Sequence, residues 1–154
     1  MTDSQFLETR AAFALRVKQL HDRLSEQLDA AMAKCGLLIP GKTTGIVQLL
    51  YSEGPCSKAD IADRLRYSHQ LTTQRLAWLL KHGMAETNPD PEDGRRQIVS
   101  LTPDGVEQAK ILQTFLPRLQ DAYSSLFSEL GMDLDTEITN ASRLLDMKPL
   151  ADRI

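Results

Sequence analysis

The sequence has little cysteine and little histidine, and this scarcity excludes several kinds of site. The only two cysteines, Cys35 and Cys56, form no C-x-x-C pair, so neither a disulfide framework nor a zinc site is predicted. The three histidines, His21, His69 and His82, lack ligand spacing such as H-x-x-x-H. We therefore predict no metal site, no cofactor and no catalytic residue, and we do not expect an enzyme.

The sequence leaves the role of the two thiols open. Cys35 ends the apolar stripe of the first predicted helix, which favours a buried, inert thiol. Cys56 precedes a predicted helix start, a position that favours the thiolate, with only Lys58 nearby to support it. Oxidant sensing by either cysteine stays an open alternative.

Long apolar runs are also missing. No segment approaches the roughly 18 consecutive apolar residues that a membrane helix needs. The start, Met1-Thr2-Asp3-Ser4, lacks the basic and then apolar opening of a signal peptide. We expect a cytoplasmic protein with no membrane contact.

A net positive charge is absent too, since 18 Lys and Arg stand against 21 Asp and Glu, for a net charge of -3. This balance argues mildly against a nucleic-acid binder, but the distribution of charge matters more than the total. Residues 64–81 contain no acid, and their basic residues precede a further basic pair: Arg64, Arg66, Arg75 and Lys81, then Arg95 and Arg96. A local basic surface is therefore predicted.

Apolar residues with helical spacing dominate the first third of the chain. A stripe over residues 13–35 predicts a long helix that Gly36 ends. A second helix is predicted to begin at Thr43 or Thr44 and to stop at the Gly-Pro pair at 54–55. It is expected to bury Ile46, Val47, Leu50 and Tyr51.

Two short helices follow, separated by residues 66–67 alone. Ser57 and Asp60 form an S-x-x-D capping pattern at the start of the third helix. Ser68 caps the fourth helix, which closes at Gly83. Their inward residues are expected to be Ala59, Ile61, Ala62 and Leu65 on the third helix and Thr72, Leu76 and Leu79 on the fourth. Such a pair is typical of a helix-turn-helix unit.

A β-hairpin with an exposed basic tip is predicted next. Residues 84–88 and 96–101 favour strands, and residues 89–94 between them are mostly turn formers. The fold class is therefore mainly α with a small β-hairpin wing, a winged helix-turn-helix flanked by N- and C-terminal helices.

Two more helices complete the chain. The sequence at 102–104 supplies a cap, a proline and an acid for a long helix, in which Pro117 predicts a kink, and Asp133 caps the last helix. The long helices carry more apolar surface, especially over 106–130, than a slim monomer could cover, so we predict a homodimer.

These elements predict a single domain over residues 1–154. The winged helix-turn-helix lobe would span about 40–102, and the dimerisation helices 1–36 and 103–154.

Residues 36–43 match the Walker A pattern G-x-x-x-x-G-K-[ST] letter for letter. A P-loop needs a strand that leads into the loop within a parallel sheet, whereas the residues before this segment have helical periodicity. We therefore interpret the segment as a linker between the first two helices, not as a nucleotide site.

The hairpin carries the most specific signal. Asp93 and Arg95 form a D-x-R pattern, and L-T-x-x-G follows at 101–105. With the order of the helices, this resembles the MarR family of winged helix-turn-helix transcriptional regulators along nearly the whole chain. The resemblance implies that Arg95 enters the DNA minor groove, oriented by Asp93. The plain alternative is a solvated hairpin tip.

The resemblance also implies how such a protein works. It would be a homodimeric regulator, usually a repressor, that binds a palindromic DNA operator and is released when a small-molecule effector settles between the dimerisation helices and the lobe. The rival interpretation is a winged-helix protein-interaction module without DNA binding. The basic wing tip and the acid-free helix favour DNA.

By the same resemblance, residues 68–82 form a recognition helix in the major groove. Gln suits bidentate pairing with adenine, and the Thr methyl suits contact with thymine. The candidate DNA-binding residues are Ser68, His69, Gln70, Thr73 and Gln74 on this helix and Asp93, Arg95 and Arg96 on the wing.

Two positions depart from the family pattern. Gln74 stands where relatives often carry arginine, and Arg75 stands where an apolar or small residue is usual. Arg75 either takes over base readout or, as we favour, packs its stem and forms a salt bridge. Trp78 is expected to pack in the core, with a domain edge or a ligand cavity as alternatives.

Overall fold

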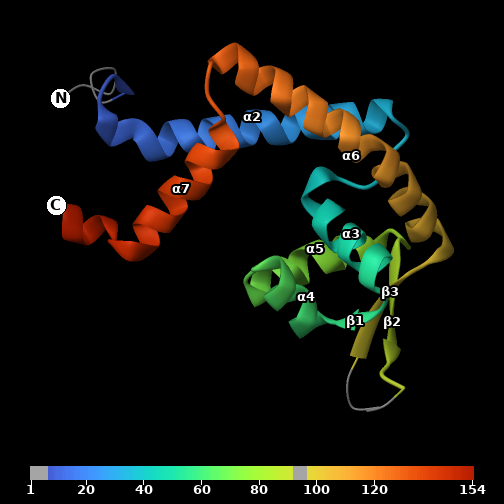
Figure 1. Cartoon of the computed structure of the whole chain (residues 1–154). Helices are drawn as coiled ribbons and strands as arrows, with labels where there is room; N and C mark the ends of the chain where they lie inside the picture. Colours follow the sequence, from blue (N-terminus) through green and yellow to red (C-terminus); the bar gives the residue numbers. More distant parts are fainter. Residues whose placement is uncertain (1–6, 92–96) are drawn as a thin grey trace. The chain divides into compact units, whose positions relative to one another are not determined.

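The computed structural model describes residues 7–91 and 97–154, most of which are helical (Figure 1). The elements are η1 (Arg10–Ala12), α2 (Phe13–Lys34), η2 (Gly41–Thr43), α3 (Thr44–Glu53), β1 (Cys56–Ser57), α4 (Lys58–Leu65), α5 (His69–Lys81), β2 (Ala85–Pro89), β3 (Gln97–Leu101), α6 (Pro103–Leu130), α7 (Leu134–Met147) and η3 (Leu150–Arg153). The predicted fold class is confirmed. Among the described residues, no helix combines the length and apolar character needed to cross a membrane.

The chain divides into two compact units. One ends at Phe115 and the other runs from Leu116 to Ile154. The division falls inside α6, close to Pro117. The predicted lobe over about 40–102 and the dimerisation helices on either side of it stay predictions. Helix α6 continues through Pro117, and the kink expected there stays a prediction.

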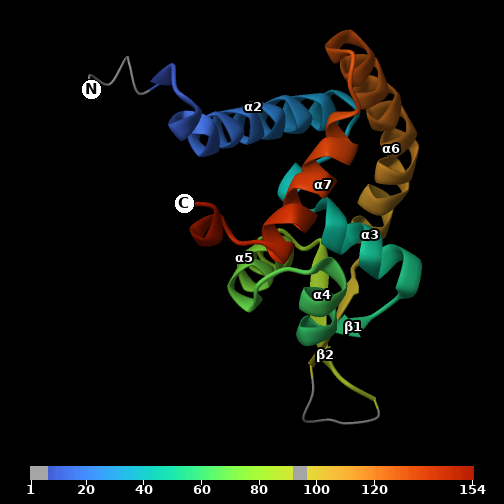
Figure 2. The ribbon, with the colours of Figure 1, turned by 60° about the vertical axis from the view of Figure 1, so that its left-hand side comes forward.

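The first unit has its core where α3, α4 and α5 meet the sheet (Figure 2). The buried apolar side chains here are Ile46, Val47, Leu49, Leu50, Ile61, Ala62, Leu76, Leu79 and Val99. Two predicted core residues, Tyr51 and Ala59, are exposed instead. Ala59 is two residues from Ile61, about 200° around the helix, so both cannot face one core. On α3, Leu49 takes the inner place predicted for Tyr51.

The sheet is antiparallel with the strand order β1-β3-β2. Ala85 pairs with Leu101 and Pro89 with Gln97, which confirms the hairpin within one residue at each strand start. Strand β1, which pairs Cys56 with Val99, was not predicted. A strand of two residues shows no alternation of apolar and polar positions, so the sequence contains no signal for it.

The second unit has no core of its own. No side chain from Leu116 to Ile154 is buried. Its last helix begins as predicted, because the carboxylate of Asp133 accepts a hydrogen bond from the backbone N–H of Thr136 at 3.3 Å. The large apolar side chains that it exposes are Leu126, Leu130, Met132, Ile138, Leu144, Leu145, Met147, Leu150 and Ile154.

Candidate DNA-contacting surface

The predicted capping box at the start of α4 is present. Ser57 Oγ accepts from the Asp60 N–H at 3.2 Å, and the Asp60 carboxylate accepts from the Ser57 N–H at 3.2 Å. At the other end of α4, Arg66 adopts the left-handed conformation with φ 53°. The Tyr67 N–H then donates to the Ala62 carbonyl at 2.9 Å. These bonds define a tight turn into α5.

Helix α5 separates a buried side from an exposed side. Its buried residues, Thr72, Leu76 and Leu79, are at most 4% exposed, as predicted. Ser68 caps the helix by accepting from the Leu71 N–H at 3.2 Å. The Thr73 hydroxyl donates to the His69 carbonyl at 2.7 Å, which leaves its methyl group for apolar contact. The structure exposes all five helix residues that the sequence singled out: Ser68, His69, Gln70, Thr73 and Gln74.

The basic residues around α5 differ in their surroundings. Arg64 forms an ion pair with Glu53, an acid outside the acid-free segment. Arg66 and Lys81 are exposed, one before and one at the end of α5. The charge available to an anionic partner therefore comes from the two ends of this helix.

Arg75 differs from its prediction. Its guanidinium carbon lies 4.2 Å from the centroid of the Tyr67 ring. None of the ion pairs among the described residues includes it, so the salt bridge favoured by the sequence analysis is wrong. A cation over an aromatic ring takes its place.

Trp78 is only half-buried, so its predicted place in the core is wrong. Its ring stacks on the imidazole of His82, with centroids 3.9 Å apart and an interplanar angle of 15°. The ring Nδ1 of His82 is also 2.8 Å from the Trp78 carbonyl oxygen. The pair forms the end of α5.

The wing consists of β2 and β3. Pro89 pairs with Gln97 at the end of the hairpin, and the sequence between these two residues includes the D-x-R pattern. The predicted wing residues lie outside the described part of the chain: Asp93, Arg95 and Arg96. Their expected roles therefore stay predictions.

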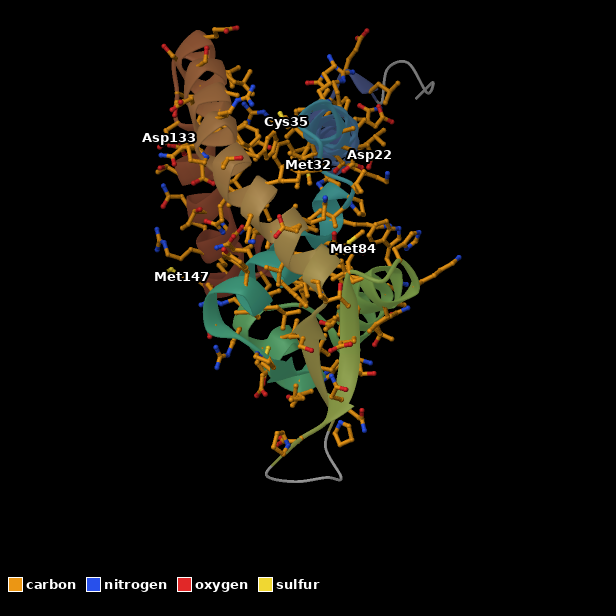
Figure 3. The ribbon with its side chains drawn as sticks, turned by 90° about the vertical axis from the view of Figure 1, so that its right-hand side faces the viewer. Asp22, Met32, Cys35, Met84, Asp133 and Met147 are labelled. Carbon is orange, nitrogen blue, oxygen red and sulfur yellow. The ribbon has the colours of Figure 1, made fainter. Side chains whose placement is uncertain are left out.

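The L-T-x-x-G pattern joins the wing and α5 to α6. Thr102 Oγ1 donates to the Gly83 carbonyl at 2.5 Å and accepts from the Gly105 N–H at 3.1 Å. The Thr102 N–H donates to the Met84 carbonyl at 3.2 Å. Met84, labelled in Figure 3, lies between α5 and β2 close to the start of α6. The pattern, which served in the sequence only as a family signature, thus also has a structural role: it fixes the start of α6.

The Walker-like segment has no free phosphate cradle. The Gly41 N–H already donates to the carboxylate of Asp29 at 2.6 Å, where a phosphate would need to bind. Thr43 is fully buried, and its hydroxyl donates to the Pro40 carbonyl at 2.7 Å. Within residues 7–55 no strand leads into the segment. The interpretation as an interhelical linker agrees with this geometry.

The surroundings of Cys56 disfavour its thiolate. Burial, and then the carboxylate of Asp60, raise the pKa of the Cys56 thiol, so the thiolate tendency predicted for it is wrong. Cys56 lines a shallow pocket of about 400 Å³ together with Arg64 and Ile98. Cys35 is half-buried. In residues 7–91 and 97–154, no group of three or more His, Cys, Asp or Glu side chains is arranged to hold a metal ion.

A family model and solved structures both match this chain. Residues 39–96 match a family model described as the MarR family. A comparison with curated proteins finds no match. Among solved structures, the S. aureus MepR–DNA complex is 17% identical, with a TM-score of 0.67 over 91% of this chain and 99% of that one.

Two further structures are similar. A mutant of E. coli MarR complexed with operator DNA is 19% identical, with a TM-score of 0.66 over 94% of this chain and 98% of the other. The heme sensor protein PefR from Streptococcus agalactiae, in complex with heme, is 20% identical, with a TM-score of 0.62 over 90% and 95%. The resemblance is therefore confirmed: residues 39–96 form a MarR family segment, and the chain has the winged helix-turn-helix fold of the MarR-type regulators.

Proposed function

We propose that the protein is a sequence-specific DNA-binding transcription regulator without enzymatic activity, which binds a palindromic operator as a homodimer and acts as a repressor. The exposed side of α5 is the observation that carries this proposal. It places Gln and Thr side chains beside one another, free of acids, on a helix whose other side is buried. Such a surface suits base-edge readout in the major groove. The similar structures of MepR and MarR were solved with DNA.

The homodimer is supported by the apolar surface of both units. No side chain from Leu116 to Ile154 is buried, although this segment is rich in leucine. Helix α2 exposes a second apolar set: Phe13, Leu15, Val17 and Leu20. A second subunit would cover these surfaces and hold two recognition helices about 34 Å apart, one turn of DNA.

Release from DNA would depend on a small-molecule effector in the cytoplasm. Support comes from PefR, a protein of this fold that was solved with heme. Thermodynamic linkage requires that such an effector bind the DNA-free conformation more tightly than the DNA-bound one. The effector of this chain is proposed only as a class, a small molecule.

Selection of binding sites from random duplex DNA tests the proposal. The expected product is a palindrome with half-sites about 10 base pairs apart. A gel shift with the DNA that flanks the protein's own gene should then show preference over a shuffled duplex of the same composition. No enrichment and no shift at low salt would refute DNA binding and favour the protein-interaction module.

A further inference from the structure

Arg75 lies on the core side of α5, away from the candidate base-reading residues. Residues three and four positions apart are neighbours on a helix surface. Of the four neighbours of Arg75 at these spacings, Thr72 and Leu79 are fully buried, and Leu71 and Trp78 are half-buried. Arg75 itself is half-buried, whereas Gln70 and Gln74 are exposed. Its side chain therefore does not belong to the surface that would face base edges.

The guanidinium of Arg75 contacts an aromatic ring that belongs to the turn. Tyr67, whose ring centroid is 4.2 Å from the guanidinium carbon, connects α4 to α5. Its hydroxyl oxygen is 2.9 Å from the place of a β-carbon on Gly45, in the first turn of α3. The stack thus connects α5, through the turn, to α3.

This stack contributes little net stability. A partly buried cation–π contact is favourable, but Nε of Arg75 is buried without a hydrogen-bond partner among the described residues. A buried donor without a partner has a cost of similar size, so the two effects nearly cancel. An apolar side chain would stabilise the fold at least as well.

We propose that Arg75 and Tyr67 are a positioning pair, which sets the rotation of the recognition helix and thereby selects the side chains that reach base edges, while neither residue touches DNA. The inference rests on the proposed function, because it takes α5 as the recognition helix. Base-edge contacts depend on placement within about 0.5 Å and 10–20°. A small rotation of α5 would therefore weaken operator binding and leave non-specific binding intact.

The test compares wild type with Arg75→Met, Tyr67→Leu and the double variant. Methionine retains an extended side chain but removes the charge and the buried donor. We expect Arg75→Met to fold with an unfolding midpoint no lower than wild type. Its preference for the selected operator over a shuffled duplex should fall about tenfold, the size of one lost base-edge contact. The dependence of affinity on salt should not change, because no phosphate contact is lost.

Three controls separate stacking from charge and from packing. Tyr67→Phe keeps the ring and should keep the wild-type preference. Arg75→Lys keeps the charge but has no planar face, so it should lose preference as Arg75→Met does. The double variant should lose no more than either single variant, because two residues that act as one pair are not additive.

Each other outcome has a definite meaning. A salt slope reduced by about two units in Arg75→Met would make Arg75 a phosphate contact and overturn the inference. An unchanged preference would overturn it as well, whatever the unfolding midpoint, because the pair would then contribute to stability at most. A wild-type protein without any operator preference would overturn the proposed function, and only that result would remove both.

Discussion

A β-carbon on Gly105 would lie 1.9 Å from the carbonyl oxygen of Met84. Real side chains do not approach a backbone oxygen so closely, so glycine is the residue that allows α6 to start where it does. The same carbonyl accepts the Thr102 N–H at 3.2 Å. The first turn of α6 is thus held against Met84, the residue that joins α5 to the wing, and a movement of this turn would act on both.

Gly105→Ala should destabilise the first unit by about 1–3 kcal/mol, because the added methyl group forces α6 away from Met84. Chemical denaturation would measure the free energy of unfolding. Glu107→Ala, an exposed change in the same turn, should stay within about 0.5 kcal/mol of wild type. A Gly105→Ala protein as stable as Glu107→Ala would contradict the close approach.

Thr102→Val should cost about 1–2 kcal/mol, because valine has the shape of threonine but can neither cap α6 nor bond the Gly83 carbonyl. Thr102→Ser keeps the hydroxyl and should lose much less. The comparison of the two unfolding curves isolates the hydroxyl. Equal losses in both variants would show that the methyl group matters as much as the two hydrogen bonds.

Local signals in the sequence were sufficient for most of the secondary structure. The Ser57 and Asp60 capping box, the stop at Gly54 and the Ser68 and Asp133 caps each depend on residues within one turn of each other, and all are present. Interactions of this range leave a readable spacing in the chain. The helix residues proposed for DNA contact could be found because they lie opposite a regular apolar stripe.

Features that depend on contacts between different elements could not be predicted. Strand β1 exists only because β3 pairs with it. The partner of Arg75 is the ring of Tyr67, in the turn before α5, and not a carboxylate. Cys56 illustrates the same limit, since a helix start favours the thiolate but burial outweighs it. In each case the deciding neighbour comes from tertiary packing.

Leu145→Glu should convert a homodimer into monomers. Leu145 is 49% exposed on α7, and an unpaired carboxylate buried in an interface should weaken dimerisation about 100-fold or more. Sedimentation at micromolar concentration would report the mass. Leu38→Glu is the matched control, since Leu38 is 70% exposed but lies in the loop after α2, and it should remain dimeric. A wild-type protein that sediments as a stable monomer would refute the dimer.

Cys56 should react slowly with iodoacetamide at neutral pH. Burial and Asp60 raise its thiol pKa above the usual value of about 8.5, so little thiolate is present. The folded state therefore favours the neutral thiol. This preference stabilises the folded state below pH about 8.5, and the stabilisation is lost as pH rises through the folded pKa. Cys35→Ser isolates the rate of Cys56, and the same chain in denaturant is the reference. Faster reaction in the folded protein would contradict the raised pKa.

Arg95→Ala and Gln70→Ala should affect DNA binding in opposite ways, because phosphate-region contacts position a protein whereas base contacts specify sequence. Loss of Arg95 removes one cation per subunit and two per dimer. The slope of log affinity against log salt should therefore shrink by about two units, with little change in operator preference. Asp93→Asn should give a weaker version of this effect, because the arginine remains but is less well oriented.

Gln70→Ala and Thr73→Ala should instead cost about 1–3 kcal/mol at individual base pairs and leave the salt slope nearly unchanged. Lys110→Ala, which removes an exposed cation of α6 that pairs with Glu107, controls for net charge and should change neither the base-pair cost nor the salt slope. Titrations with operator and shuffled DNA over a range of salt separate the two groups. If Arg95→Ala keeps both its slope and its affinity, the hairpin tip is ordinary solvated surface, and readout belongs to α5 alone.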